Sequence, residues 1–514
     1  MSALRDQPTE LSTPPSKQPG RQAILSKRLS QALVRMRTPA VICALVACLN
    51  AASWSFITPP FQTPDEPSHF AYVQQLANTG HLPTSGGEKF SPDEATALRY
   101  LHWARVKRRP QFHTIASRDE QRALERNLAT SSGSSRRATG AAGVAASQPP
   151  LYYALETIPY ELGSPGGLLA QLQLMRLLSA LMAGATALFA FLFLRESLPA
   201  TPWAWTVGGL AVALTPLLAS MSGAVNPDAM LFAVSAAGFY CLARAFRRGL
   251  TPRLALATGA VIAVGVLTKL TFLGLVPGML LGLLAVTARG WRSHGRVALR
   301  PLALALATGA GPICVYVLVN LASGRAALGL ASGILDSATH RGSFGGEISY
   351  IWQLYLPRLP GMHTDFADIS PVRNIWFDGL IGQFGWADTF FPGWAYDLAL
   401  VPAGLIAALC IRALVVERAA LSLRAVELSV YAAIALGLLV VVGASSYAIF
   451  PEQAAGFPEP RYLLPLLALM GGVVALAALG AGRRFGVTVG ALVIVLFVAY
   501  DILSELQVIA RYYG

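Results

Sequence analysis

The sequence predicts an all-α polytopic membrane protein with about eleven transmembrane helices. Of its 514 residues, 54% are hydrophobic and only 13% are charged, and the mean hydropathy is +0.51. Apolar runs of about 20 residues with almost no charge recur along the chain, and a helix of that length crosses the hydrocarbon core of a bilayer. The predicted spans are residues 39–57, 168–194, 203–221, 227–246, 253–270, 271–288, 301–321, 394–415, 427–447, 460–480 and 486–505.

Lys and Arg are distributed unevenly between the two sides of these spans. In a soluble protein, the formal net charge of +13 would favour a nucleic-acid partner. With the N-terminus inside, however, the inner segments carry the basic residues, as in 244–253 and 289–300, while the short outer turns 222–226 and 448–459 contain none. This is the positive-inside pattern. We therefore expect a cytoplasmic N-terminus, an outer C-terminus and no nucleic-acid partner.

The predicted spans divide the chain into a basic cytoplasmic tail without stable structure, a transmembrane domain and a short outer tail. Two long outer loops interrupt the helical array. Basic and aromatic residues are interleaved between Arg99 and Phe112, which suits either an interfacial helix in the headgroup plane or an ordinary solvated helix. The expected boundaries are 1–38 for the first tail, 39–505 for the transmembrane domain, 58–167 and 322–393 for the loops, and 506–514 for the outer tail.

The first long loop begins with an acidic pair held between prolines. Asp65 and Glu66 lie between Pro64 and Pro67, a few residues beyond the first predicted span, and His69 follows. Ionisable groups so close to the hydrocarbon are costly to place and are functional candidates by default. The pair therefore predicts proton chemistry at the mouth of a membrane helix.

Other polar residues next to the spans lie on the same predicted outer side, and each has a structural alternative. Asn226 suits a helix start, Lys269 suits a side chain that snorkels to the interface, and Arg461 suits an interfacial anchor. Arg176 lies within a span and needs an anionic partner. Because nearly all of these groups share one side, we expect one outer cavity that holds carboxylates for base chemistry and cations for a phosphate.

Taken in order, the motifs along the chain resemble the bacterial DUF2142 membrane-protein family. They extend from about residue 60 to about residue 470. The matching motifs are Pro64-Asp65-Glu66-Pro67-Ser68-His69-Phe70, Gln148-Pro149-Pro150-Leu151-Tyr152-Tyr153, Arg176-Leu177-Leu178-Ser179, Asn226-Pro227-Asp228, Leu267-Thr268-Lys269-Leu270, Tyr355-Leu356-Pro357-Arg358-Leu359-Pro360, Phe384-Gly385-Trp386-Ala387-Asp388 and Pro460-Arg461-Tyr462-Leu463-Leu464-Pro465.

That family in turn resembles the GT-C glycosyltransferases, which share an acidic motif in the first outer loop followed by interfacial helices. The resemblance implies transfer of a sugar from a polyprenyl-phosphate donor to a cell-envelope acceptor, outside the bacterial cytoplasmic membrane. The acceptor is a glycan, lipid or protein, and membrane lipids are further partners. Asp65 is the expected catalytic base, and Glu66 the group that orients the acceptor. The expected substrate-binding residues are His69, Tyr152, Arg176, Asn226, Asp228, Lys269, Trp386, Asp388, Arg461 and Tyr462.

Three of these residues are candidates for the donor phosphate, namely Arg461, Lys269 and Arg176. A divalent cation held by Glu66 and His69 is an open alternative to a metal-free site. The five cysteines fall inside predicted spans and lack metal-ligand spacing, so they are assigned no metal.

Other functions remain as alternatives to the transferase. A glycan polymerase or ligase would use the same chemistry. A transporter or flippase of a lipid-linked glycan would use the charged residues for binding alone, but it predicts inverted repeats and broken helices near the midplane, which the sequence does not show. A membrane scaffold would need neither an acidic pair nor an intramembrane arginine.

Overall fold

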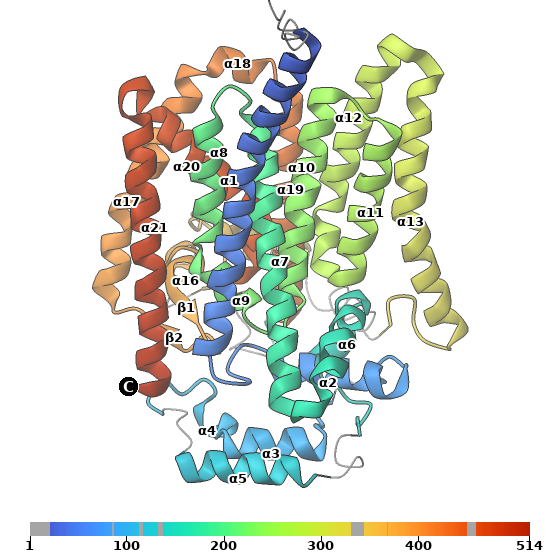
Figure 1. Cartoon of the computed structure of the whole chain (residues 1–514), viewed down its shortest axis with the longest axis vertical. Coiled ribbons are helices and arrows are strands. Elements are labelled where there is room, and N and C mark those ends of the chain that lie inside the picture. The colour runs from blue at the N-terminus through green and yellow to red at the C-terminus, as the bar shows by residue number, and fades with distance from the viewer. Residues whose placement is uncertain are drawn as a thin grey trace, which may run out of the picture.

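The computed structural model describes residues 21–84, 87–112, 117–131, 137–329, 344–366, 369–449 and 459–514, with side chains from Thr38 onward except those of His294 and Ile449. Long helices stand side by side, and a layer of short helices covers one end of the bundle (Figure 1). The long elements are α1 (Arg21–Ile57), α7 (Gly167–Ser197), α8 (Pro202–Ala213), α9 (Pro216–Ser222), α10 (Asp228–Arg248), α11 (Pro252–Thr268), α12 (Val276–His294), α13 (Leu299–Ala322), α17 (Gly393–Val416), α19 (Ala425–Ile449), α20 (Leu467–Gly480) and α21 (Gly482–Tyr513).

The connecting elements are short helices, helical turns and one two-stranded antiparallel hairpin. The helices are α2 (Glu66–Thr79), α3 (Pro92–Tyr100), α4 (Trp103–Val106), α5 (Arg118–Ala129), α6 (Leu151–Gly163), α15 (Phe344–Tyr355), α16 (Asp378–Gly382) and α18 (Arg418–Ser422). The turns are η1 (Gly143–Ser147), η2 (Ser164–Gly166), η3 (Leu270–Gly274), η4 (Gly295–Ala298), η5 (Pro371–Phe377) and η6 (Pro460–Leu466), and the hairpin pairs β1 (Gln383–Phe384) with β2 (Thr389–Phe390).

The predicted fold class, an all-α polytopic membrane protein, is confirmed. Each of the eleven predicted spans falls on a helix or on a broken helix. Eight helices in the described part of the chain are long and apolar enough to cross a membrane, or nine if the bent pair α8 and α9 counts as one span. Of the two remaining predicted spans, α11 is an apolar helix of 17 residues, and α12 is not among those eight helices.

The bend between α8 and α9 has a local cause in the sequence. Pro216 begins α9, and the two helices meet at 54°. Proline has no backbone N–H and its ring clashes with the preceding turn, so a helix breaks at such a residue. The break turns α9 toward the hairpin β1–β2.

Glycines bring the helices near the site into close contact. A Cβ on Gly208 of α8 would lie 2.5 Å from the carbonyl oxygen of Gly471 on α20, and a Cβ on Gly471 would lie 2.9 Å from that of Gly208. Small residues facing each other let backbones approach in this way. The contact holds α20, and η6 before it, beside the α8–α9 bend.

The two ends of the bundle differ in what covers them. We call the end that carries α3, α4 and α5 the loop end, and the C-terminus lies there too (Figure 1). The opposite end carries α18 and the N-terminal part of α1. α1 begins at Arg21 within the predicted first tail, whose residues 1–20 lie outside the described residues, and α21 continues through most of the predicted outer tail, to Tyr513.

Candidate functional site

Five charged side chains from distant parts of the sequence meet within the bundle, next to the loop end. Asp65 precedes α2, Asp228 begins α10, Lys269 follows α11, and Glu459 and Arg461 lie at the start of η6. We call these five residues the charged cluster. It joins three carboxylates to two cations, and four of its members had been expected in one cavity from the sequence.

Asp65 has an unusual backbone that frees its side chain. Its φ is 63° and its ψ is 4°, in the left-handed region, which Asp tolerates better than most residues. It occupies the N-cap position of α2, yet its carboxylate makes no capping hydrogen bond. Instead Oδ2 accepts from Nη2 of Arg461 at 3.1 Å, and the side chain is 31% exposed.

Arg461 is the centre of the charged cluster. Its side chain is 4% exposed and contacts all three carboxylates. Besides the contact with Asp65, Nε lies 2.6 Å from Oε2 of Glu459 and 3.7 Å from Oδ2 of Asp228. Nε is therefore occupied by its ion pair with Glu459, whereas Nη1 has no hydrogen-bond partner among the described residues. Buried donors are nearly always satisfied, so Nη1 points to a polar ligand.

Lys269 completes the cluster from the far side of Asp228. Its Nζ lies 2.6 Å from Oδ1 of Asp228. The ring of Tyr462 lies beneath both cations, with Nζ of Lys269 and Cζ of Arg461 each 5.5 Å from the ring centre. At that distance an aromatic face attracts a cation.

The electrostatic surroundings define the protonation states. Burial raises the pKa of Asp65, but the positive charges of Arg461 and, to a smaller extent, Lys269 oppose burial, and the pKa of Asp65 lies below its usual value. Burial lowers the pKa of His69 to about 3, against the attraction of Asp65. Burial raises the pKa of Glu459, and Arg461 opposes the rise. At neutral pH, Asp65 is therefore a carboxylate and His69 is neutral.

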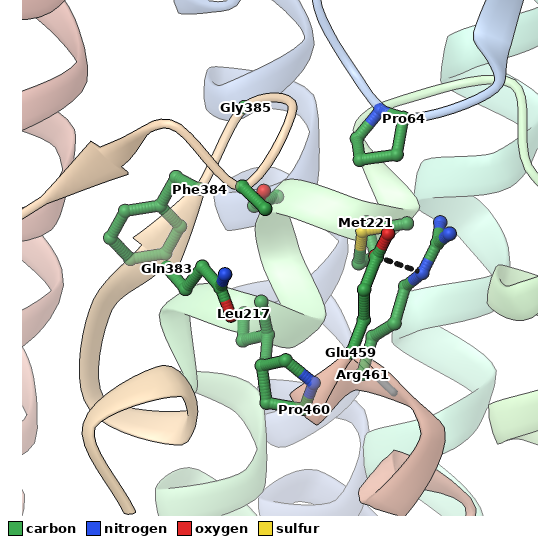
Figure 2. Close-up of a pocket in the computed structure, with 11 residues that line it drawn as sticks. Pro64, Leu217, Met221, Gln383, Phe384, Gly385, Glu459, Pro460 and Arg461 are labelled. Carbon is green, nitrogen blue, oxygen red and sulfur yellow. Dashed lines mark ion pairs between the residues drawn. The ribbon is translucent and has the colours of Figure 1, made fainter. Parts of the chain in front are cut away.

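A small recess opens beside Arg461. Pro64, Met221 and Gly385 line it together with Glu459 and Arg461 (Figure 2). Its volume is about 10 Å³, which is room for a single water molecule. Residues 450–458, directly before Glu459, lie outside the described residues.

Glu66 and Arg176 form a buried ion pair that holds the acidic loop in place. Nε and Nη2 of Arg176 donate to the two carboxylate oxygens at 2.7 and 2.6 Å, and neither side chain is more than 1% exposed. The remaining N–H groups of Arg176 donate to the carbonyls of Ser55, Thr58 and Pro59. With all five donors used, Arg176 has none left for a phosphate in this structure.

Glu66 is equally committed to the protein. Its carboxylate also accepts from the backbone N–H groups of Phe61 at 2.8 Å and Val225 at 3.1 Å. Four hydrogen bonds use the acceptor positions of a carboxylate, which leaves none for a divalent cation shared with His69. His69 points elsewhere, with Nδ1 2.9 Å from the hydroxyl of Tyr153. The structure therefore does not bring Glu66 and His69 together as metal ligands.

In the described part of the chain, no group of three or more His, Cys, Asp or Glu side chains is placed to hold a metal ion. The carboxylates of the charged cluster surround the guanidinium of Arg461 instead of an empty centre.

Asn226 links the acidic loop to the start of α10. Its Oδ1 accepts from the backbone N–H of Asp228 at 2.9 Å, the helix-start contact considered from the sequence, and its Nδ2 donates to the carbonyl of Pro64 at 3.4 Å. Asn226 is fully buried. It thus positions Asp65 and Asp228 relative to each other without facing the recess.

Tyr152 and Asp388 lie apart from the charged cluster. The hydroxyl of Tyr152 is 2.8 Å from that of Ser179, in a fully buried position. Asp388 forms an ion pair at 3.3 Å with Arg511 near the end of α21. Burial raises the pKa of Asp388, and Arg511 opposes the rise. Both residues serve packing and loop attachment in this structure.

Trp386 lies against the acidic loop and reveals a residue that the motifs had not singled out. Its Nε1 donates to the carbonyl of Phe61 at 3.2 Å. Lys107 places its Nζ 4.0 Å from the centre of the Trp386 ring and 4.3 Å from that of Trp103. Lys107 also interacts electrostatically with Asp65. A cation and two indole rings thus group beside the acidic loop.

Sequence reasoning had not selected Lys107 or Glu459 as site residues. Glu459 directly precedes the Pro460-Arg461 motif, and this adjacency was an available signal. Lys107 lies in the basic and aromatic stretch of the first loop, where several neighbouring cations look alike in sequence. Only the fold distinguishes Lys107 from those neighbours.

Comparison with known proteins bears on the family and the fold. A family model described as "Predicted membrane protein (DUF2142)" matches residues 48–470. No significant match is found among curated proteins. The chain is similar to the crystal structure of the Archaeoglobus fulgidus oligosaccharyltransferase in the apo form, with 12% identity and a TM-score of 0.42. The match covers 92% of this chain and 56% of that one, so the chain spans little more than half of that enzyme, and a likeness at this level assigns no activity.

Proposed function

The chain belongs to the DUF2142 family of predicted membrane proteins, and from the chemistry of the charged cluster we propose that it is a membrane glycosyltransferase of GT-C type. It transfers a sugar from a polyprenyl-phosphate donor to a hydroxyl of a cell-envelope acceptor. The observation that carries the proposal is the pairing of a half-buried carboxylate, Asp65, with a buried guanidinium, Arg461, whose Nη1 lacks a hydrogen-bond partner among the described residues.

In the proposed reaction, the acceptor oxygen attacks the anomeric carbon of the donor. A new C–O bond forms to the acceptor as the bond between the anomeric carbon and the phosphate oxygen breaks. The hydroxyl proton passes to Asp65, and general-base assistance of this kind contributes about 10²- to 10⁴-fold in rate. The electron pair of the broken bond leaves on the polyprenyl phosphate, whose charge Arg461 and Lys269 stabilise.

The neighbouring residues act through position in this proposal. Glu66 and Arg176 hold the loop from Ser55 to Phe61, and Asn226 holds Pro64, so that Asp65 faces Arg461. A sugar needs far more room than one water molecule, so donor binding separates the walls of the recess. Trp386 contacts the acidic loop at Phe61, and Lys107 lies over the rings of Trp386 and Trp103; aromatic faces beside a cation suit a sugar ring and a phosphate.

We place the loop end outside the cytoplasmic membrane, because the basic segments 244–253 and 289–300 lie at the opposite end of the bundle and are expected inside. No nucleotide sugar is available outside, so the proposed donor is linked to a membrane lipid. Such a donor can diffuse within the membrane to a site near the loop end.

The test is sugar transfer by the full chain, purified in detergent, with a panel of synthetic polyprenyl-phosphate sugars and envelope acceptors. We expect Asp65→Asn to bind the donor and to lower turnover at least about 100-fold, since the general base is lost. Asp119→Asn is the matched control, because this aspartate has a 93% exposed side chain on α5. Near-normal turnover by Asp65→Asn would falsify the assignment of the base. Donor binding without transfer to any acceptor would favour the transporter.

A further inference from the structure

A second polar cavity lies at the end of the bundle opposite the charged cluster. Its volume is about 750 Å³, and its walls come from the end of α7, from α10 and α12, and from the α18–α19 connection. α10 begins in the charged cluster at Asp228 and reaches this cavity at Arg247, which at 1.5 Å per residue separates the two places by about 30 Å. The cavity therefore belongs to a separate site.

Four arginines and two glutamates line this cavity, and both glutamates are already neutralised. Glu196 is fully buried, and Arg244, Arg247 and Arg248 of α10 lie 3.2, 3.1 and 3.0 Å from its oxygens. Glu427 pairs with Arg424 at 2.7 Å. The local charge is thus strongly positive.

Arg289 and Arg292 supply the cations that no carboxylate of the described residues neutralises. Both line the cavity from α12, and neither is within ion-pair distance of an acidic side chain there. They are three residues apart on a helix, so they occupy neighbouring positions on one side. Two guanidinium forks side by side match the oxygens of one phosphate group.

The rest of the wall is apolar and continues along α12. Ala285 and Ala288 line the cavity beside Val426, and Leu281 and Leu284 are 52% and 53% exposed one turn further along α12. Along α12 the surface thus changes from arginines to alanines to exposed leucines. Such a surface matches a molecule with a charged headgroup and a hydrocarbon tail. The volume falls within the range of about 300–1,000 Å³ typical of small-ligand sites.

From these observations we propose that the cavity binds the phosphate headgroup of an anionic phospholipid, with Arg289 and Arg292 on the phosphate and the lipid chain along α12. This site is distinct from the proposed transferase site and does not depend on it. Basic pockets between membrane helices have the chemistry to hold such headgroups.

The test measures lipid binding to the purified full chain by native mass spectrometry at about 0.15 M ionic strength, where exposed charges are screened beyond about 8 Å. The probes are phosphatidylglycerol and, as the soluble source of the same phosphate group, sn-glycerol 1-phosphate. The variant is Arg289→Gln/Arg292→Gln. The control is Arg296→Gln/Arg300→Gln, which removes the same charge from two exposed arginines of η4 and α13 that do not line the cavity.

We expect phosphatidylglycerol to bind and Arg289→Gln/Arg292→Gln to weaken its binding at least about 10-fold, while the control stays within about 2-fold of the unaltered chain. Equal weakening in both double variants would overturn the site, since charge alone would then explain binding. Glycerol phosphate binding as tightly as the lipid would overturn the lipid as the source of the phosphate. The four substituted arginines are surface-exposed, so we expect every variant to remain folded, and thermal melting checks this.

Discussion

Asp65 and Arg461 are 396 residues apart in sequence and 3.1 Å apart in space. This contact gives each residue a property that it would lack alone. The guanidinium of Arg461 keeps Asp65 ionised. The carboxylates around Arg461 in turn neutralise its buried positive charge, which would be strongly destabilising without them. The donors of Arg461 that make no hydrogen bond then remain for a ligand phosphate.

Substitution of Arg461 tests the phosphate role. Arg461→Lys keeps the charge but loses the fork that pairs with two phosphate oxygens. We therefore expect weaker donor binding, seen as a higher KM for the donor, with a larger rise in Arg461→Ala. The measurement is turnover against donor concentration in detergent. Arg483→Lys, at an exposed position, serves as the control. Unchanged donor dependence in both variants would move the phosphate to Lys269.

The pH dependence of turnover tests the protonation states. A carboxylate with a lowered pKa stays charged as the pH falls, and a histidine with a pKa of about 3 stays neutral, so neither Asp65 nor His69 titrates between about pH 5 and 8. Burial raises the pKa of Glu459, so on acidification Glu459 takes up its proton before Asp65, whose pKa is lowered. We expect Glu459→Gln to remove the first acid limb of the kcat/KM profile.

The contrary result for this pH profile is specific. An inflection near the ordinary histidine pKa of 6.5 that disappears in His69→Gln would show that His69 titrates in the working range. That result would contradict the neutral state proposed for His69 at working pH.

At the scale of the elements, one side chain of α7 organises the junction between α1 and α2. Arg176 donates to three backbone carbonyls around that junction, those of Ser55, Thr58 and Pro59, and to Glu66, the first residue of α2. The close glycine contact between α8 and α20 holds η6 from the other side. The charged cluster therefore depends on two helix packings as well as on its own residues.

Breaking the Glu66–Arg176 pair should lower the stability of the fold, because the proposed role of this pair is to position the loop and not to contact the substrate. Arg176→Ala leaves a buried carboxylate without its partner, which costs about 3–5 kcal/mol. We expect a clear fall in the melting temperature of the purified protein in detergent. Arg122→Ala, which breaks an exposed pair on α5, should leave it nearly unchanged. A fully stable Arg176→Ala protein that loses only donor binding would instead return Arg176 to the phosphate site.

At the scale of the whole molecule, the two ends of the bundle carry different chemistry. The charged cluster lies where α2 and α10 begin, toward the loop end, and the second cavity is lined by the last turns of α10 and α12 and by the α18–α19 connection, toward the other end. Arg511 ties the C-terminal helix to the loop end through the carbonyls of Val106 and Arg109 and through Asp388. This attachment places the C-terminus on the same side as the long first loop.

Cysteine labelling tests the proposed orientation. In a chain whose native cysteines are replaced, Glu125→Cys on α5 should react with an impermeant maleimide added to intact cells, and Arg296→Cys should react only after lysis. The reason is the positive-inside distribution of Lys and Arg. Labelling of Arg296→Cys in intact cells would reverse the orientation.

The sequence by itself determined the membrane class and the positions of the helices, and it singled out the acidic loop as a candidate site. Each of these depends on local properties, since a run of about 20 apolar residues specifies a span wherever it occurs. The motif Asp65-Glu66 was visible for the same reason, as was the gathering of polar groups beside the spans.

Only the tertiary structure decided how those polar residues are paired. In sequence, Asp65 and Glu66 are simply adjacent acidic residues. In the fold, the left-handed backbone of Asp65 and the first turn of α2 direct Asp65 toward Arg461 and Glu66 toward Arg176. The three candidate cations were equally indistinguishable, because an arginine's partners depend on which helices pack around it. Burial and pairing are properties of helix packing, so the division between a buried structural ion pair and a cluster with unsatisfied donors emerged only with the fold.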